Sequence, residues 1–428
     1  MRILYNEKKY SSFANIPYSI IRQIAEKVLD INRKAKSEKE KVIDLTMGQN
    51  FLGNPRILFE AIKWLNNKDF NAPILYEPSV GSIDARESVA KNFYSFFYRF
   101  SSDEFSADNV MLTDGAFGAV RNALGAIMDP GDILVVDRLT FRYFIQALMV
   151  MGRLSSLENV FTLPADEDSG FIPKIDTAIE FLLDLKKRYS DRKIVYYTQF
   201  GFNPTGCFRT QKELKELVEF IEEEKNLFLI NDIAYHLIRW NNLDIPLASY
   251  FADEDAGIVD ADSLSKPFSL MGARVGVLIT RNKELYRYAA LVQQYSIVSP
   301  SKFCVDIWRA ASHPEVLPKI REYLQKLVAE IRRNKELFEK RLEKLGFKGC
   351  SKSVGTIYSF LRVPRPSRNF YEELLNKAKV AVVPGYAFSD PSDPIGDQFI
   401  RATISLPPEK LEEGIRRIEQ FFSSQDFT

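Results

Sequence analysis

Residues 263–274 of the 428-residue chain have the sequence Ser-Leu-Ser-Lys-Pro-Phe-Ser-Leu-Met-Gly-Ala-Arg, and this stretch decides the fold. It follows residues 257–261, a run that could be a buried strand. Lys266, held in a pocket, could lose its proton and form a Schiff base with a carbonyl. The neighbouring hydroxyls and Arg274 suit a phosphate dianion. A ligand with an aldehyde and a phosphate would fit both the lysine and the group formed by the hydroxyls and Arg274. The alternative is a surface Lys and Arg on a Ser-rich turn.

The composition describes an ordinary globular protein without an obvious polyanionic partner. Hydrophobic residues make up 46%, enough for a large core, and the length predicts about two to three domains. The 58 basic residues nearly balance the 57 acidic ones, so neither nucleic acid nor a membrane surface is expected as a partner. No apolar run has the length of a membrane-spanning helix.

Cysteine and histidine usage indicates a reducing compartment and no metal. Three cysteines, Cys207, Cys304 and Cys350, form an odd set without CxxC spacing, so we expect no disulfide framework. Two histidines make a His-based metal site improbable. The first ten residues carry charge and lack an apolar core, which predicts no signal peptide. A cytoplasmic location is therefore expected.

The segment before residue 82 predicts a helix, a short strand and two turns. Apolar spacing predicts a helix over 18–36, and residues 42–45 a strand. The forty or so residues before that strand are too few for a DNA-binding domain with its linker. Gly48 either forms only a turn or offers its backbone N–H to a carboxylate. Tyr76 precedes a Pro/Gly turn and is ambiguous alone.

Residues 109–141 predict a strand, a glycine turn, a helix and a second strand. The strand over 109–113 leads into Gly115-Ala116, and Phe117 begins the apolar face of the helix. This order aims free backbone N–H groups at an anion. Phe141 lies just past the strand at 133–136, where its ring could stack on a ligand or fill the core.

Two further strands end in polar residues. The strand at 193–197 precedes the turn Asn203-Pro204-Thr205-Gly206, and the strand at 227–230 precedes Asp232 and Tyr235. Open α/β sheets place ligand contacts at such carboxyl ends. Predicted helices at 175–188 and 212–224 alternate with the strands. This alternation predicts an α/β fold with a mostly parallel sheet flanked by helices.

The pattern changes after residue 300. A long amphipathic helix is predicted over 320–344, followed by strands at 355–363, 380–383 and 399–404. Arg401 lies inside the last strand, and an arginine in an apolar strand requires an anion. The alternative is a surface arginine on an edge strand. These elements predict a smaller α+β domain.

In this order, the motifs resemble those of the fold-type I pyridoxal phosphate (PLP) enzymes, and most of all the class I and II aminotransferases. The resemblance covers roughly residues 42 to 420 and rests on the Asn-Pro-Thr-Gly turn and the Ser-x-Ser-Lys motif with its following arginine. It implies a large PLP-binding domain and a small domain. The expected boundaries are 1–75 for an N-terminal arm and part of the small domain, 76–305 for the large domain, and 306–428 for the C-terminal small domain.

The resemblance also implies a role for each site residue. The expected cofactor-binding residues are Gly115, Ala116, Phe117, Phe141, Asn203, Asp232, Tyr235, Ser263, Ser265, Lys266 and Arg274, with Tyr76 reaching in from a second subunit. Lys266 would hold PLP and move the substrate α-proton, Asp232 would keep the pyridine nitrogen protonated, and Tyr235 would contact the ring oxygen. Gly48, Asn203 and Arg401 would bind the substrate α-carboxylate. The family often has proline where Leu139 stands and tyrosine at Phe141.

Three functions are compatible with these residues. The first is an aminotransferase that moves an amino group between an L-amino acid and a 2-oxo acid. The alternative is a PLP-dependent lyase or cyclase acting by β- or γ-elimination or replacement, similar to ACC synthase or a C–S lyase. A non-catalytic ligand sensor is disfavoured by the intact Lys266, Asp232, Asn203 and Arg401. The expected partners are small-molecule substrates and a second copy of the chain, in a homodimer with shared sites.

Overall fold

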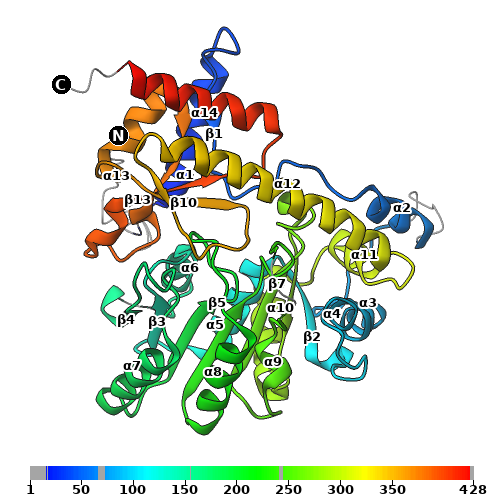
Figure 1. Ribbon diagram of the computed structural model, residues 1–428. Helices are drawn as coiled ribbons and strands as arrows, with labels where there is room; N and C mark the ends of the chain where they lie inside the picture. Colours follow the sequence, from blue (N-terminus) through cyan, green and yellow to red (C-terminus); the bar gives the residue numbers. More distant parts are fainter. Residues whose placement is uncertain (1–15, 17, 66–72, 155, 241–243, 425–428) are drawn as a thin grey trace, which may run out of the picture.

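The computed structural model describes residues 16, 18–65, 73–154, 156–240 and 244–424 (Figure 1). Its largest sheet consists of β2 (Val110–Asp114), β3 (Ile133–Asp137), β4 (Val160–Leu163), β5 (Ile194–Gln199), β6 (Leu227–Asp232), β7 (Ile258–Ser263) and β8 (Val275–Ile279). The spatial order is β2-β8-β7-β6-β5-β3-β4. Neighbours pair in parallel except at β8, which is antiparallel to both β2 and β7. The predicted mostly parallel sheet is confirmed.

Both faces of this sheet are buried beneath helices, which explains why most of its strands begin as apolar runs. β7 is the exception, since it contains the buried Asp260 and Asp262. In β3, Ile133 and Val135 belong to one apolar cluster, whereas Leu134 and Val136 belong to another on the opposite face. The helices of this part are α2 (Arg56–Leu65), α3 (Ile83–Ser88), α4 (Tyr94–Tyr98), α5 (Ala116–Ile127), α6 (Tyr143–Val150), α7 (Ile175–Arg188), α8 (Gln211–Glu223), α9 (Ala248–Phe251), α10 (Lys283–Ile297) and α11 (Lys302–Ala311).

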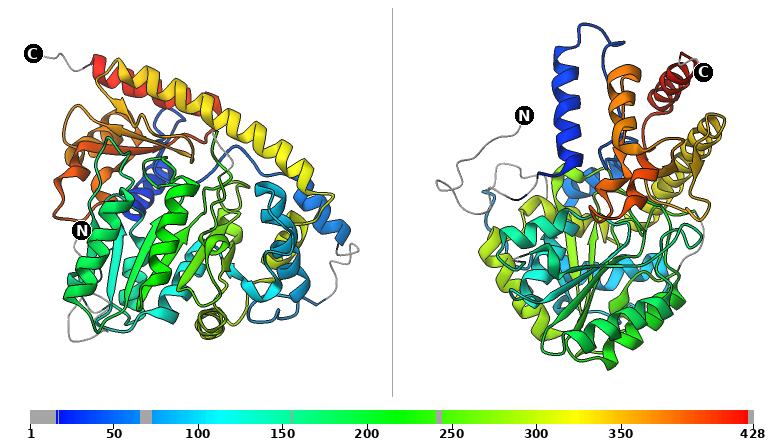
Figure 2. Two further views of the ribbon diagram at one scale, coloured as in Figure 1. Left: turned by 60° about the horizontal axis from the view of Figure 1, so that its bottom comes forward. Right: turned by 90° about the vertical axis from the view of Figure 1, so that its left-hand side faces the viewer.

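A second, smaller part lies across the end of the large sheet (Figures 1 and 2). Its antiparallel sheet contains, in spatial order, β12 (Val383–Pro384), β13 (Phe399–Thr403), β10 (Tyr358–Arg362) and β9 (Lys348–Gly349). β1 (Ile43–Asp44) pairs in parallel with β11 (Val380–Ala381), so the N-terminal segment joins this part. Its helices are α1 (Ile20–Lys34), α12 (Leu317–Glu343), α13 (Ser367–Glu373) and α14 (Pro408–Ser423).

The structure corrects two of the predicted strands. The strand predicted over 355–363 begins only at Tyr358, because Thr356 has a φ of 64°, outside the extended region. The strand predicted over 380–383 is two short strands, β11 and β12, which belong to different sheets. The domain boundaries stay a prediction, and α11 runs through the one at 305/306. Among the described residues, no helix has both the length and the apolar character needed to cross a membrane.

Candidate active site

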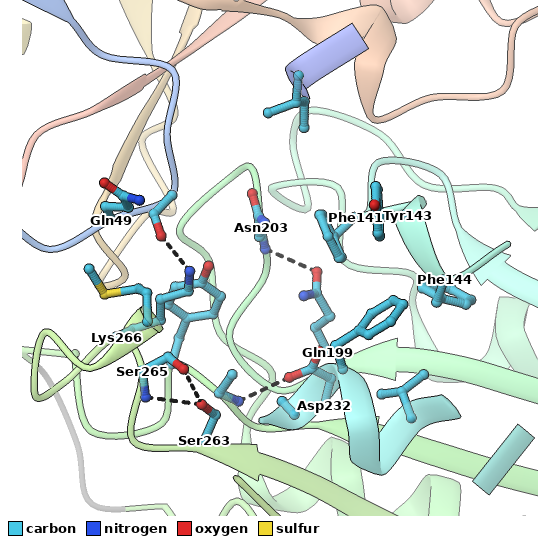
Figure 3. Close-up of a pocket in the computed structure, with 18 of the residues that line it drawn as sticks. Gln49, Phe141, Tyr143, Phe144, Gln199, Asn203, Asp232, Ser263, Ser265 and Lys266 are labelled. Atoms are coloured by element: carbon cyan, nitrogen blue, oxygen red, sulfur yellow. Dashed lines mark hydrogen bonds between the residues drawn. The ribbon is translucent and has the colours of Figure 1, made fainter. Parts of the chain in front are cut away.

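A cavity of about 580 Å³ lies at the carboxyl ends of β5, β6 and β7, between the two parts of the molecule (Figure 3). The large part contributes the ends of the parallel strands and the start of α5. The small part contributes the segment after β1 and side chains from β10 and β13. The predicted site residues that line the cavity are Gly48, Ala116, Phe117, Phe141, Asn203, Asp232, Tyr235, Ser263, Ser265, Lys266, Arg274 and Arg401.

Lys266 lies in the connection between β7 and β8, with its ammonium directed at the small part. Its Nζ donates a hydrogen bond to the backbone carbonyl of Gly48. Burial lowers the pKa of Lys266, and the nearby guanidinium groups of Arg401 and Arg274 lower this pKa further. A lysine whose proton is easier to remove is better suited to act as a nucleophile or a base.

Asp232 ends β6 and is buried at the floor of the cavity. One carboxylate oxygen accepts a hydrogen bond from the Tyr197 hydroxyl at 2.8 Å, and the other accepts from the Ala234 backbone N–H at 3.0 Å. Burial raises the pKa of Asp232 to about 6 because both donors are neutral and only partly replace water. A cationic ring nitrogen placed against this carboxylate would restore its ionised form.

Arg401 enters the cavity from β13 and is only 2% exposed. It donates to the Asn203 side-chain oxygen at 2.9 Å and to the Thr46 carbonyl at 2.5 Å. Its guanidinium carbon lies 4.1 Å from the ring centroid of Tyr358 and 4.9 Å from that of Phe388. Within the described part of the chain, its Nε atom has no hydrogen-bond acceptor. The alternative of a surface arginine on an edge strand is thereby excluded.

The start of α5 and the segment after β7 form a polar corner of the cavity. Gly115 precedes the helix with a φ of 85°, and a Cβ atom on it would lie 2.7 Å from Arg274 Nη2. Arg274 donates to the Asp114 carbonyl at 2.9 Å. Ser263 Oγ donates to Ser265 Oγ at 2.6 Å. Free helix N–H groups, two hydroxyls and a guanidinium therefore converge, as an anion site requires.

Gly276 is a residue of this corner that the sequence did not single out. A Cβ atom there would lie 2.2 Å from the Gly115 carbonyl carbon, so only glycine lets β8 approach the turn. Nothing in the sequence marks Gly276 as part of the site. Its importance depends on which strand lies beside β8, and the sequence did not predict β8 at all.

Tyr358 is a second residue that sequence reasoning missed. Its hydroxyl is 2.7 Å from the Tyr235 hydroxyl, and a Cβ on Gly48 would meet it at 2.4 Å. Tyr358 begins an apolar strand, and this pattern looks like core in the sequence. Phe141 lies in the cavity as predicted, and its ring stacks on Tyr143 with a centroid separation of 5.9 Å.

Tyr76 does not reach this cavity within its own chain. Its side chain is 89% exposed, and its neighbours Ile74 and Leu75 are 84% and 75% exposed. The sequence assigned Tyr76 to the site of a second subunit, so its exposure here is compatible with that assignment without testing it. The role of Tyr76 stays a prediction.

The described residues fit the cofactor that the sequence predicts. PLP needs an amine for its aldehyde, a cradle for its phosphate, a carboxylate for its ring nitrogen and an aromatic face for its ring. Lys266, the Gly115–Arg274 corner, Asp232 and Phe141 supply these groups around one cavity. The lowered pKa of Lys266 suits reaction with the aldehyde, and a cationic ring nitrogen beside Asp232 would offset the burial that raises the pKa of this carboxyl.

Comparison with known proteins agrees with this geometry. The family model described as aminotransferase class I and II matches residues 40–418. An aspartate aminotransferase of Thermotoga maritima is 28% identical over 415 residues, covering 95% of this chain and all of that protein. An LL-diaminopimelate aminotransferase of Natranaerobius thermophilus is 26% identical, covering 91% and 94%.

Solved structures show the same fold. The Thermus thermophilus aspartate aminotransferase with maleate superposes with a TM-score of 0.80 at 21% identity, covering 96% of this chain and 99% of that one. The family match spans most of the chain, and the relatives align along nearly their whole length. The chain therefore belongs to the class I and II aminotransferase family and is a PLP-dependent aminotransferase.

Proposed function

We propose that this aminotransferase moves an amino group between an L-amino acid and a 2-oxo acid, and that Arg401 holds the α-carboxylate common to both. The burial of Arg401 carries this proposal. A buried guanidinium with only neutral acceptors is costly unless an anion pairs with it. A carboxylate accepts two parallel hydrogen bonds from a guanidinium, which fixes both its position and its orientation.

The proposed roles of the other residues follow from their positions. Lys266 Nζ takes the α-proton of the bound amino acid. In the second half of the reaction, it delivers a proton to the α-carbon that comes from the 2-oxo acid. Its lowered pKa keeps more of the amine neutral and able to accept that proton. Bound PLP supplies an electron sink for the electron pair left at the α-carbon. Asp232 would pair with the ring nitrogen and keep it protonated, which the electron sink requires.

The proposal specifies the α-carbon groups of the substrate and not its side chain, because the relatives are named after different amino acids. They include aspartate, aromatic amino acid and LL-diaminopimelate aminotransferases. The amino acids in these names share an α-amino group and an α-carboxylate, which are the parts that Lys266 and Arg401 would contact. The alternative of elimination or replacement is not favoured, since the relatives named here are aminotransferases.

A substrate screen tests this proposal. Purified holoenzyme is offered each amino acid, with LL-diaminopimelate included, and 2-oxoglutarate or pyruvate as the acceptor. Formation of glutamate or alanine, dependent on the acceptor, is the expected result. Release of ammonia and a 2-oxo acid without any acceptor would instead support the lyase alternative.

We also propose the assembly and location. A homodimer would cover the exposed run of Ile74, Leu75 and Tyr76, and homodimers are the commonest closed assemblies. The cytoplasm is the proposed location, on the basis of the cysteine usage alone. The division at residues 75/76 and 305/306 remains our proposal for the domain boundaries.

A further inference from the structure

Two of the three cysteines lie side by side although 143 positions separate them in the chain. The sulfur atoms of Cys207 and Cys350 are 3.4 Å apart. Cys207 directly follows the Asn203–Gly206 turn of the large part. Cys350 directly follows β9 of the small part. Neither lines the cavity, so the aminotransferase chemistry does not account for this pairing.

Backbone hydrogen bonds hold the two sulfur atoms in this position. The Gly206 carbonyl accepts from the backbone N–H groups of Val354 and Gly355, at 2.9 and 3.1 Å. The Cys350 N–H donates to the Phe360 carbonyl at 3.3 Å, which ties it to β10. A Cβ on Gly170 would lie 2.6 Å from Cys207 Sγ, so the Gly170 backbone packs closely against that sulfur. The pair is therefore preorganised.

The two thiols differ in access and in acidity. Cys207 is fully buried, whereas Cys350 is half-buried. A hydrogen bond from the Cys207 thiol lowers the pKa of Cys350, and the positive charge of Lys335 lowers it further. The same hydrogen bond, together with burial, raises the pKa of Cys207. Cys350 is thus the thiol that an external reagent reaches first, since the thiolate is the nucleophile.

We propose that Cys207 and Cys350 are a reversible redox site that forms an intramolecular disulfide with a small disulfide oxidant such as oxidised glutathione. The Cys350 thiolate attacks one sulfur of the oxidant, and the first small thiol leaves. Cys207 then loses its proton and attacks the Cys350 sulfur, and the second small thiol leaves. Two electrons pass to the oxidant, and the two protons of the protein thiols end on the released thiols.

The mixed disulfide at Cys350 also removes the obstacle to the second step. Once Cys350 is no longer a thiolate, the hydrogen bond that raised the pKa of Cys207 is lost. The new covalent bond joins the turn that carries Asn203 to the β9–β10 connection. It closes a loop of 143 positions, a length for which a cross-link strongly restricts the unfolded chain.

The test is oxidation of the folded holoenzyme with oxidised glutathione, followed by alkylation and peptide mapping. The expected product has lost two free thiols, contains a peptide linking Cys207 to Cys350, and returns to the starting mass with dithiothreitol. Its midpoint of thermal unfolding should rise by roughly 5 °C. The proposal fails if the wild-type protein keeps all its thiols or if glutathione stays on Cys350 without a linked peptide.

Three variants give matched controls. Cys350→Ser and Cys207→Ala should each lose both the linked peptide and the thermal shift. Cys304→Ala removes the remaining buried cysteine, whose Sγ contacts the Thr113 carbonyl at 3.5 Å, and should keep both signals. A linked peptide or thermal shift that survives either of the first two variants would assign the oxidation elsewhere. Because the readouts are masses and unfolding, the result does not depend on the proposed substrate.

Discussion

Arg401 Nη1 donates a hydrogen bond to Asn203 Oδ1 at 2.9 Å, and this bond joins the two parts of the molecule inside the cavity. Arg401 comes from β13 of the small sheet, whereas Asn203 comes from the turn after β5 of the large sheet. A carboxylate bound by Arg401 would therefore touch both parts at once. Among the residues that the structure describes, none accepts a hydrogen bond from the buried Nε of Arg401, so the guanidinium keeps one donor without a protein acceptor.

The first prediction concerns Arg401→Lys. A lysine keeps the charge but cannot form two parallel hydrogen bonds to a carboxylate. We expect KM to rise about tenfold or more for every amino acid substrate, since losing one charged hydrogen bond costs about 1.5–3 kcal/mol. Arg362→Lys on the adjacent strand β10 is the control, because Arg362 pairs with Glu167 outside the cavity. An effect confined to one class of substrate would show that Arg401 binds side chains instead.

The second prediction concerns Gly276→Ala in the apoprotein. The added methyl group would lie 2.2 Å from the Gly115 carbonyl carbon, so either β8 or the turn before α5 must move. We expect a lower midpoint of thermal unfolding and weaker binding of inorganic phosphate. Gly272→Ala is the matched control, because a Cβ there meets no atom within 4 Å. Equal stability of the two variants would show that the close approach of β8 is unimportant.

The third prediction concerns the pH dependence of Asp232→Asn. The folded-state pKa of Asp232, about 6, lies above its ordinary value of 3.8, so the folded chain binds this proton more tightly than the unfolded chain. The resulting stabilisation is fully present below pH 3.8 and is lost as the pH rises through about 6. Between pH 5 and pH 8, the wild-type apoprotein should lose about 1 kcal/mol that the variant keeps. Urea unfolding at both pH values measures this difference.

Asp137→Asn separates this stability effect from the role of Asp232 at the cofactor. Asp137 is also buried, its pKa is also raised to about 6, and it accepts hydrogen bonds from Tyr196 and Thr198 away from the cavity. Each variant should lose less stability than the wild-type protein between pH 5 and pH 8. Only Asp232→Asn should weaken PLP binding and catalysis. Equal PLP affinity and turnover in the two variants would contradict the assignment of Asp232.

The sequence was sufficient to predict a site residue where both its chemical type and its position beside a predicted strand indicated the same role. Lys266 stands between hydroxyls next to a predicted strand, and Asp232 ends one, so residue type and position predicted the same site. Arg401 was predicted because an arginine in an apolar strand requires an anion. In each case a few adjacent residues were enough for the prediction, and all three side chains line the cavity.

The rest depends on contacts between distant segments. Tyr358 belongs to the cavity because β10 pairs with β13 and brings its hydroxyl to Tyr235. Gly276 matters because β8 lies antiparallel beside β2, a pairing that alternation of strands and helices does not predict. Cys207 and Cys350 meet only because the turn before Cys207 accepts hydrogen bonds from the small part. Sequence patterns show which residues face inward, but not which neighbour they meet.

The fourth prediction concerns covalent attachment of the cofactor. Borohydride reduction of the holoenzyme followed by peptide mapping should place PLP on Lys266, the lysine that lines the cavity with a lowered pKa. Lys266→Arg should abolish the modified peptide without unfolding the chain. Modification of a different lysine in the wild-type protein would overturn the assignment.

The last prediction concerns a site shared across a homodimer, with Tyr76 as the contributed residue. Lys266→Ala should hold no covalent PLP, and Tyr76→Ala should bind PLP weakly. When the two variants are co-expressed with different tags and the mixed dimer is isolated, one site combines an intact Lys266 with an intact Tyr76 from its partner. Activity should therefore rise above that of either variant alone, towards half of the wild-type value per dimer.

The control for this experiment replaces the first variant with the double variant Lys266→Ala, Tyr76→Ala. Its mixed dimer with Tyr76→Ala has an intact lysine in one site but no intact Tyr76 anywhere, so no complete site can form. Recovery in the first mixture and none in the second requires Tyr76 to act across the interface, where its 89% exposure in the single chain would be covered. If isolated mixed dimers of the first kind show no recovery, Tyr76 acts within its own chain or away from the cofactor.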